Sequence, residues 1–249
     1  MGGVIDGSSW NDKNFQSHRR SLDARFDSLW DAESPIQEFL LAAFEETGSE
    51  AYPDRKQISE WVDTGSLRAA SVFFSSPLLT GRKYIIVVKA KNAAGHVATC
   101  ESNGVTIDTA PPTAGTVSIM HDSIAVDAQT RWLGVFCDEF HDTESGIDVF
   151  LVSILEMETD STIASAMLFS QGSVKFLNVK LQAGRHYTAL VTARDRAGNE
   201  VAALSEAVLA ASDDEYLPDA SRIFGGSPTV FRTSLHAVVY IVNHVLPLL

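Results

Sequence analysis

The sequence predicts an all-β protein made of two tandem antiparallel β-sandwiches followed by a short C-terminal extension. Two observations carry this prediction. Blocks of residues recur in the same order along the chain, and the blocks contain runs in which apolar and polar residues alternate with the period of a half-buried strand. The composition fits a folded chain, since 45% of the 249 residues are apolar and 20% are charged.

The internal repeat is clearest at two motifs. The stretch Asp31-Ala-Glu-Ser-Pro-Ile36 recurs 111 positions later as Asp142-Thr-Glu-Ser-Gly-Ile147. The stretch Leu78-x-x-Gly-x-x-Tyr84 recurs 103 positions later as Leu181-x-x-Gly-x-x-Tyr187. Solenoid repeats are only about 20–50 residues long, so this spacing indicates tandem domains that each have their own core.

Strands are predicted directly after the second motif in each copy. The apolar face after Tyr84 carries Ile86, Val88 and Ala90, and the face after Tyr187 carries Ala189, Val191 and Ala193. The segment 36–46 is ambiguous, because its apolar residues have helical spacing. We favour a strand there, since the segment aligns with the β-branched run 147–154 of the second copy.

These motifs resemble fibronectin type III domains. Leu-x-x-Gly-x-x-Tyr, the alternating strand and the turn Ala90–Gly95 are similar to the E–F corner, strand F and F–G turn of that family. Asp108-Thr-Ala-Pro-Pro112 resembles the linker between tandem repeats of surface proteins. The resemblance covers about residues 3–211 and implies that Tyr84 and Tyr187 are tyrosine-corner residues. Phe26 and Cys137 depart from the family, which usually has Trp at this position of strand B.

Domain limits follow from the repeat. We expect the first fibronectin type III-like domain at 3–112, the second at 113–211, and an extension at 212–249 that is poorly ordered or partly apolar. The apolar end of the extension, 235–249, is too short for a membrane-spanning helix, which needs about 20 residues. It is interpreted as a packed element, a lipid-anchor signal or an artefact of the gene boundaries.

Acidic residues at two equivalent turns are the best candidates for a site. They are Asp31 and Glu33 in the first copy and Asp142, Glu144 and Asp148 in the second. Oxygen clusters on loops can bind calcium, but Asp and Ser also cap their own turns by bonding to nearby backbone. The spacing of an EF-hand is absent, so we expect capping and predict no metal site and no cofactor.

No catalytic residue is predicted. The sequence has no nucleophile elbow, phosphate-binding loop or zinc-protease motif. Cys100 and Cys137 lie in different copies, so we expect two thiols and no disulfide. Cys137 replaces a core residue, and we interpret it as a small buried hydrophobe in preference to a nucleophile with His141 as its base.

The predicted function is non-catalytic. The chain is interpreted as a structural or adhesive module of a larger extracellular or cell-surface protein, with proteins or matrix components as partners. The net charge of −13 disfavours nucleic acid, and membrane attachment would require the C-terminal tail or sequence outside this chain. No secretory signal is visible at its start. The alternative is an accessory ligand- or carbohydrate-binding domain of a secreted enzyme, which surface aromatics in line on one sheet would favour. Of the four tryptophans, we expect most in the core.

Overall fold

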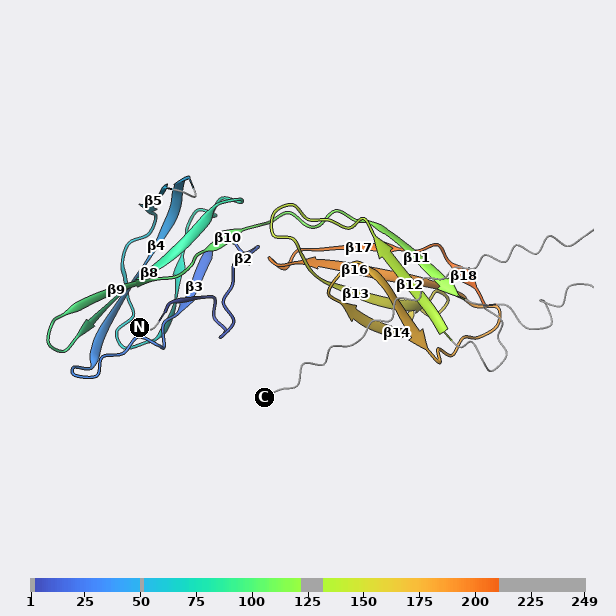
Figure 1. The fold of residues 1–249 in the computed structure, drawn as a ribbon, viewed down its shortest axis with the longest axis horizontal. Helices are drawn as coiled ribbons and strands as arrows, with labels where there is room; N and C mark the ends of the chain where they lie inside the picture. Colours follow the sequence, from blue (N-terminus) through green and yellow to red (C-terminus); the bar gives the residue numbers. More distant parts are fainter. Residues whose placement is uncertain (1–2, 50–51, 122–131, 211–249) are drawn as a thin grey trace, which may run out of the picture. The chain divides into compact units, whose positions relative to one another are not determined.

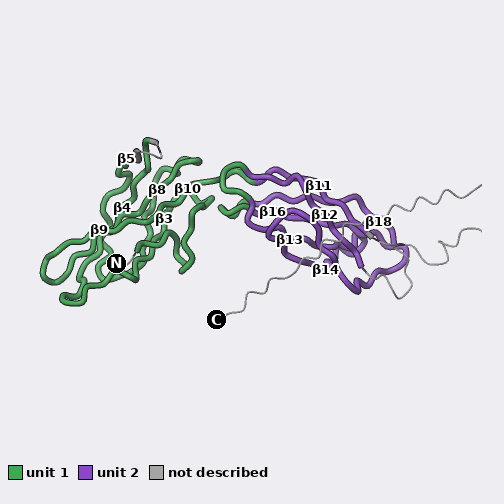
Figure 2. Tube along the Cα trace, viewed as in Figure 1, with its two compact units in different colours: residues 1–111, 143–146, 195–199 green, residues 112–142, 147–194, 200–249 purple. Residues whose placement is uncertain are grey.

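The computed structural model describes residues 3–49, 52–121 and 132–210, which form strands and connecting loops. The chain divides into two compact units (Figure 2). Unit 1 contains residues 1–111, 143–146 and 195–199, and unit 2 contains the remainder. No helix among the described residues could span a membrane. The predicted extension 212–249 lies outside the described residues, and the domain limits of 3–112 and 113–211 remain a prediction.

The first sandwich consists of two sheets formed by the strands up to residue 107 (Figure 1). Its strands are β1 Ile5–Asp6, β2 Phe15–Gln16, β3 Ser21–Arg25, β4 Ile36–Ser49, β5 Tyr52–Gln57, β6 Val62–Asp63, β7 Ala69–Phe73, β8 Lys83–Asn92, β9 Val97–Glu101 and β10 Val105–Ile107. One sheet has the order β1-β3-β7, and the other has the order β2-β10-β8-β4-β5, with β6 on β4 and β9 on β8. The described pairs are antiparallel except β2 with β10, which is parallel.

The second sandwich repeats this plan. Its strands are β11 Thr116–His121, β12 Trp132–Asp138, β13 Ile147–Glu156, β14 Ser161–Leu168, β15 Gly172–Leu177, β16 His186–Asp195, β17 Glu200–Leu204 and β18 Val208–Leu209. One sheet has the order β11-β12-β15, and the other has the order β14-β13-β16-β17, with β18 on β16. The prediction of two tandem antiparallel sandwiches is therefore confirmed.

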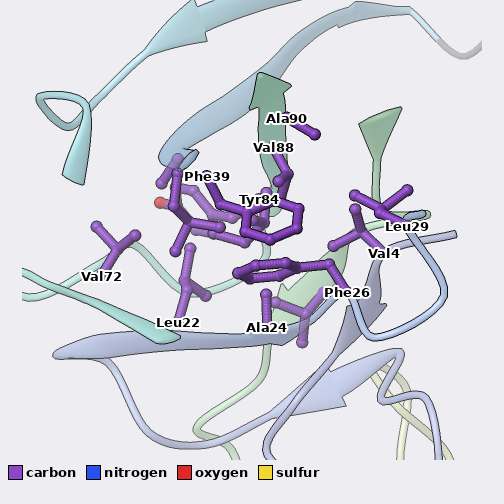
Figure 3. Close-up of a cluster of buried hydrophobic side chains, with 14 of the residues drawn as sticks. Val4, Leu22, Ala24, Phe26, Leu29, Phe39, Val72, Tyr84, Val88 and Ala90 are labelled. Atoms are coloured by element: carbon purple, nitrogen blue, oxygen red, sulfur yellow. The ribbon is translucent and has the colours of Figure 1, made fainter. Parts of the chain in front are cut away.

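The core of the first sandwich lies between its two sheets. Leu22 and Ala24 of β3 face Phe39 of β4 and Val88 of β8, and all four side chains are buried. Figure 3 shows these side chains gathered around Phe26, which is fully buried. The alternation after Tyr84 predicts this face correctly, because every second side chain of a strand points to the same side of its sheet.

The core of the second sandwich is formed by the equivalent strands. Leu133, Val135 and Cys137 of β12 pack with buried residues of β13 and β16. Ala189, Val191 and Ala193 of β16 are fully buried, as the alternation after Tyr187 predicts. Cys137 is 1% exposed and belongs to this core, where its small side chain stands at the position that Phe26 occupies in the first copy.

The ambiguous segment 36–46 is a strand. It forms most of β4, which pairs with β8 along Ile36–Glu45 and is buried on one face at Phe39, Leu41 and Ala43. The helical spacing of its apolar residues is misleading, because tertiary pairing in the middle of a sheet outweighs the local preference of such a segment for helix.

Both predicted tyrosine corners are formed. The Tyr84 hydroxyl accepts a hydrogen bond of 2.9 Å from the backbone N–H of Leu79. The Tyr187 hydroxyl accepts one of 2.8 Å from the backbone N–H of Gln182. Both rings are almost completely buried, so each bond lies where water competes weakly. Burial also raises the pKa of Tyr84.

Removing either corner hydroxyl is expected to destabilise its own sandwich. Tyr84→Phe or Tyr187→Phe keeps the packed ring but leaves one backbone N–H without its acceptor, which should cost about 1–2 kcal/mol. Urea unfolding of each variant, followed by hydrogen exchange resolved to peptides of β8 and β16, measures the loss. The variant at 84 should affect the first sandwich, and the variant at 187 the second. Unchanged stability in both variants would contradict this role of the hydroxyls.

Candidate functional site

The acidic turn of the first copy is held by hydrogen bonds to Asp31. Its Oδ1 accepts bonds of 2.8 Å from the backbone N–H groups of Glu33 and Ser34. Its Oδ2 accepts one of 3.1 Å from Nδ2 of Asn92, at the end of β8. The Ser34 backbone bond is the main cause that lowers the pKa of Asp31. The geometry is that of a capped turn.

Asn92 also organises the hairpin that joins β8 to β9. Its Oδ1 accepts a hydrogen bond of 2.8 Å from the backbone N–H of His96. At the equivalent position of the second copy, Oδ1 of Asp195 accepts a hydrogen bond of the same length from the backbone N–H of Asn199. The two hairpins therefore share one turn geometry, but the second presents a carboxylate where the first presents an amide.

A small pocket of about 210 Å³ opens beside the first turn. Its polar lining includes Asp31, Asn92 and His96, and Trp30 and Cys100 contribute to its other walls. The Trp30 side chain is 73% exposed. This combination of an accessible aromatic ring with a few polar groups is what small-ligand sites use, although the pocket is smaller than the roughly 300–1,000 Å³ typical of them.

Two buried carboxylates come together in unit 1. One carboxylate oxygen of Asp108 lies within 4.8 Å of one of Asp195. Of the acids that the sequence analysis singled out in the second copy, Asp142 belongs to unit 2 and is partly exposed, and Glu144 and Asp148 are exposed.

Sequence reasoning used Asp108 and Asp195 only as parts of fold motifs. Asp108 stands in the stretch that resembles a repeat linker, and Asp195 ends β16 at the repeated turn. The signal that could have drawn attention to Asp195 is its occurrence where the first copy has Asn92, at equivalent turns. Arg196, the next residue along the chain, is exposed.

The cysteines are both thiols in the structure. Cys137 is buried, and burial raises the pKa of its thiol. A nucleophilic cysteine requires the opposite shift, because the thiolate is the reactive form. His141 is exposed, and its Nδ1 lies 3.4 Å from the backbone oxygen of Glu139. The geometry gives Cys137 a packing role.

Asp6 is a buried acid that the sequence analysis did not single out. It is 1% exposed, and its Oδ2 accepts a hydrogen bond of 2.9 Å from the backbone N–H of Gly104. No hydrogen bond to its Oδ1 occurs among the described residues. Burial raises the pKa of Asp6 to about 6. No sequence pattern marks this position, because the burial comes from strands far apart in the chain.

The prediction that most tryptophans lie in the core is wrong. Trp10 and Trp30 are 68% and 73% exposed, and Trp61 and Trp132 are partly exposed. Three of the rings lie under cations, which stabilise an exposed aromatic face. The pairs are Arg25 over Trp10 at 4.1 Å, Lys89 over Trp61 at 3.9 Å and Lys175 over Trp132 at 4.2 Å. Trp10, Trp30 and Trp61 lie in loops, and Trp132 lies in β12 of the other sandwich, so the four rings form no row along one sheet.

Comparison with solved structures finds proteins with a similar fold. The fibronectin(III)-like modules of Clostridium thermocellum CbhA match with a TM-score of 0.51 and 12% identity, over 86% of this chain and 97% of that one. The fold is that of tandem fibronectin type III modules. With these modules, the chain shares the two-sheet sandwich and its repetition along the sequence.

Two further structures match with lower scores. A segment of titin matches with a TM-score of 0.47 and 14% identity, over 84% of this chain and 66% of that chain. The FN1–FN3 domains of chicken CNTN1 match with a TM-score of 0.43 and 15% identity, over 83% and 66%. No family model and no curated protein matches the chain. At these identities the likeness to fibronectin type III modules concerns the fold alone.

Proposed function

We propose that the chain is a non-catalytic structural or adhesive module within a larger extracellular or cell-surface protein. The observation that carries the proposal is the tandem fibronectin type III fold, in which each sandwich has its own core. Two side chains with reactive groups have structural roles. The Asp31 carboxylate caps a turn, and the Cys137 thiol packs in the core of the second sandwich. Proteins or matrix components are the proposed partners, since an acidic surface repels nucleic acid.

Stretching single molecules of the full chain tests the structural role. Two independently folded sandwiches of about 100 residues should unfold in two separate events, and each should lengthen the chain by roughly 300 Å. Phe26→Ala should remove the event of the first sandwich and leave the other. Phe73→Ala, which changes an exposed side chain of the same sandwich, is the matched control. A chain that extends without any resolved unfolding event would contradict the structural role.

A ligand-binding accessory domain is the second candidate, and the pocket beside Trp30 favours it. An exposed aromatic ring next to Asp31, Asn92 and His96 could hold a sugar ring by stacking and hydrogen bonds. Titration with soluble plant and bacterial polysaccharides, read by tryptophan fluorescence, tests this function. Trp30→Ala should abolish any response, whereas Trp10→Ala, at an equally exposed ring outside the pocket, should preserve it. The absence of a response to every polysaccharide would count against the second candidate.

A further inference from the structure

We propose that the pocket beside Trp30 binds a methylated ammonium group, such as the head of choline. The proposal rests on the ligand-binding function given above as the second candidate, and it names an organic cation as the ligand of that pocket. All of the lining residues belong to unit 1. They come from the loop before β4, from β4, β8 and β9, and from the hairpin 93–96. One compact unit therefore contains the whole pocket.

The inner wall of the pocket is apolar. Leu29 and Ala90 are buried in the core of the first sandwich, and Ile36 and Cys100 are partly buried and pack against that core. A methylated ammonium group presents carbon atoms at its surface and can contact such a wall, whereas a primary ammonium group would lose its hydrogen bonds to water there. The volume of about 210 Å³ is smaller than the roughly 300–1,000 Å³ of sites for drug-sized ligands, so the pocket fits a headgroup.

Trp30 supplies an aromatic ring for the cation. Its side chain is 73% exposed and lines the pocket. The face of an aromatic ring attracts cations, and quaternary ammonium groups are recognised in this way. Each of the other three tryptophans has a Lys or Arg side chain over its ring, at 3.9–4.2 Å. No Lys or Arg from the part of the chain that the structure describes lies over the ring of Trp30, so this ring is accessible to a cation from outside.

Asp31 gives the pocket a negative charge. The carboxylate accepts hydrogen bonds from the backbone N–H of Ser34, the side chain of Asn92 and the backbone N–H of Glu33, and these bonds lower its pKa. None of the described residues that line the pocket is Lys or Arg. Oδ1 of Asn92 is also engaged, by the backbone N–H of His96. A sugar needs several hydrogen-bond partners, whereas a methylated ammonium group needs only charge and contact, so this lining favours the cation.

Saturation-transfer NMR on the methyl protons of choline tests the site in the full chain. We expect transfer to the methyl signal that saturates as the choline concentration rises. Trp30→Ala should weaken binding at least about tenfold, and Trp30→Phe, which keeps an aromatic ring, should weaken it less. Trp10→Ala removes a similarly exposed ring outside the pocket and should bind choline as the parent chain does.

The carbon isostere of choline separates the effect of charge from that of shape. In this alcohol a tert-butyl group replaces the trimethylammonium group, so it should bind at least about tenfold more weakly than choline. Asp31→Asn should also weaken the binding of choline, and its melting temperature shows whether the turn is intact. The isostere requires no change in the protein, so it tests the role of charge even where Asp31→Asn disturbs the turn.

Free choline and phosphatidylcholine vesicles distinguish two sources of the same group. Sedimentation with vesicles that Trp30→Ala abolishes would support the proposal with a lipid headgroup as ligand, and binding of free choline alone would support it with a small soluble ligand. Equal binding of choline and its isostere, or choline binding that Trp30→Ala leaves intact, would overturn the proposal. A response to polysaccharides without one to choline would overturn the cation but not the ligand-binding function, whereas no response to either would count against both.

Discussion

Phe26→Ala is expected to unfold the first sandwich under conditions in which the second remains folded. Phe26 is completely buried, and its ring centroid lies 5.0 Å from that of Phe39. Truncation of a buried Phe to Ala costs about 3–5 kcal/mol, because the transfer energy of the ring is lost and a cavity remains. A domain of this size has only about 5–15 kcal/mol of stability, so the loss is a large part of the total.

Peptide-resolved hydrogen exchange measures this effect for each sandwich separately. Amides of β3, β4 and β8 should exchange faster in Phe26→Ala, while those of β12, β13 and β16 should keep their protection. Phe73→Ala is the control, since its ring is 79% exposed and its loss should change stability by less than about 0.5 kcal/mol. Equal protection of β3 in Phe26→Ala and in the parent chain would refute the central place of Phe26 in the core.

Asp6→Asn is expected to stabilise the first sandwich above pH 6. Asp6 has a pKa of about 6 in the folded chain, against 3.8 for an unperturbed aspartate carboxyl. The folded state therefore binds this proton more tightly than the unfolded state does. The resulting stability is fully present below about pH 4 and is lost as the pH rises to about 6. At 1.36 kcal/mol per pKa unit, the loss amounts to about 3 kcal/mol.

The asparagine side chain of this variant cannot lose a proton. Its free energy of unfolding, relative to that of the parent chain, should therefore increase between about pH 4 and pH 6 and level off above pH 6. Urea unfolding at closely spaced pH values between 4 and 8 measures the difference. Glu60→Gln removes an exposed acid from the same sandwich and should follow the parent curve. A constant difference between Asp6→Asn and the parent chain at every pH would show that Asp6 does not titrate in this range.

Periodicity and repetition in the sequence predicted the fold. A half-buried strand has alternating apolar and polar residues, and tandem domains of one fold repeat the same motifs along the chain. The alternation after Tyr84 and Tyr187 identified buried faces correctly, since a strand turns every second side chain to the same side. The alignment of 36–46 with 147–154 also outweighed a misleading local signal. Repetition was decisive here, because two copies of one fold place equivalent residues in equivalent environments.

The buried acids depended on contacts that no local pattern contains. Asp108 and Asp195 come together within unit 1 only because segments far apart in the sequence lie near one another. For the same reason the sequence did not mark Asp6 as buried. It also misplaced the tryptophans, three of which have rings that lie under cations from strands. The sequence by itself determined the strand faces and the two corners. Only the tertiary structure decided which acids are buried together, because burial and charge depend on distances between residues that the chain order does not encode.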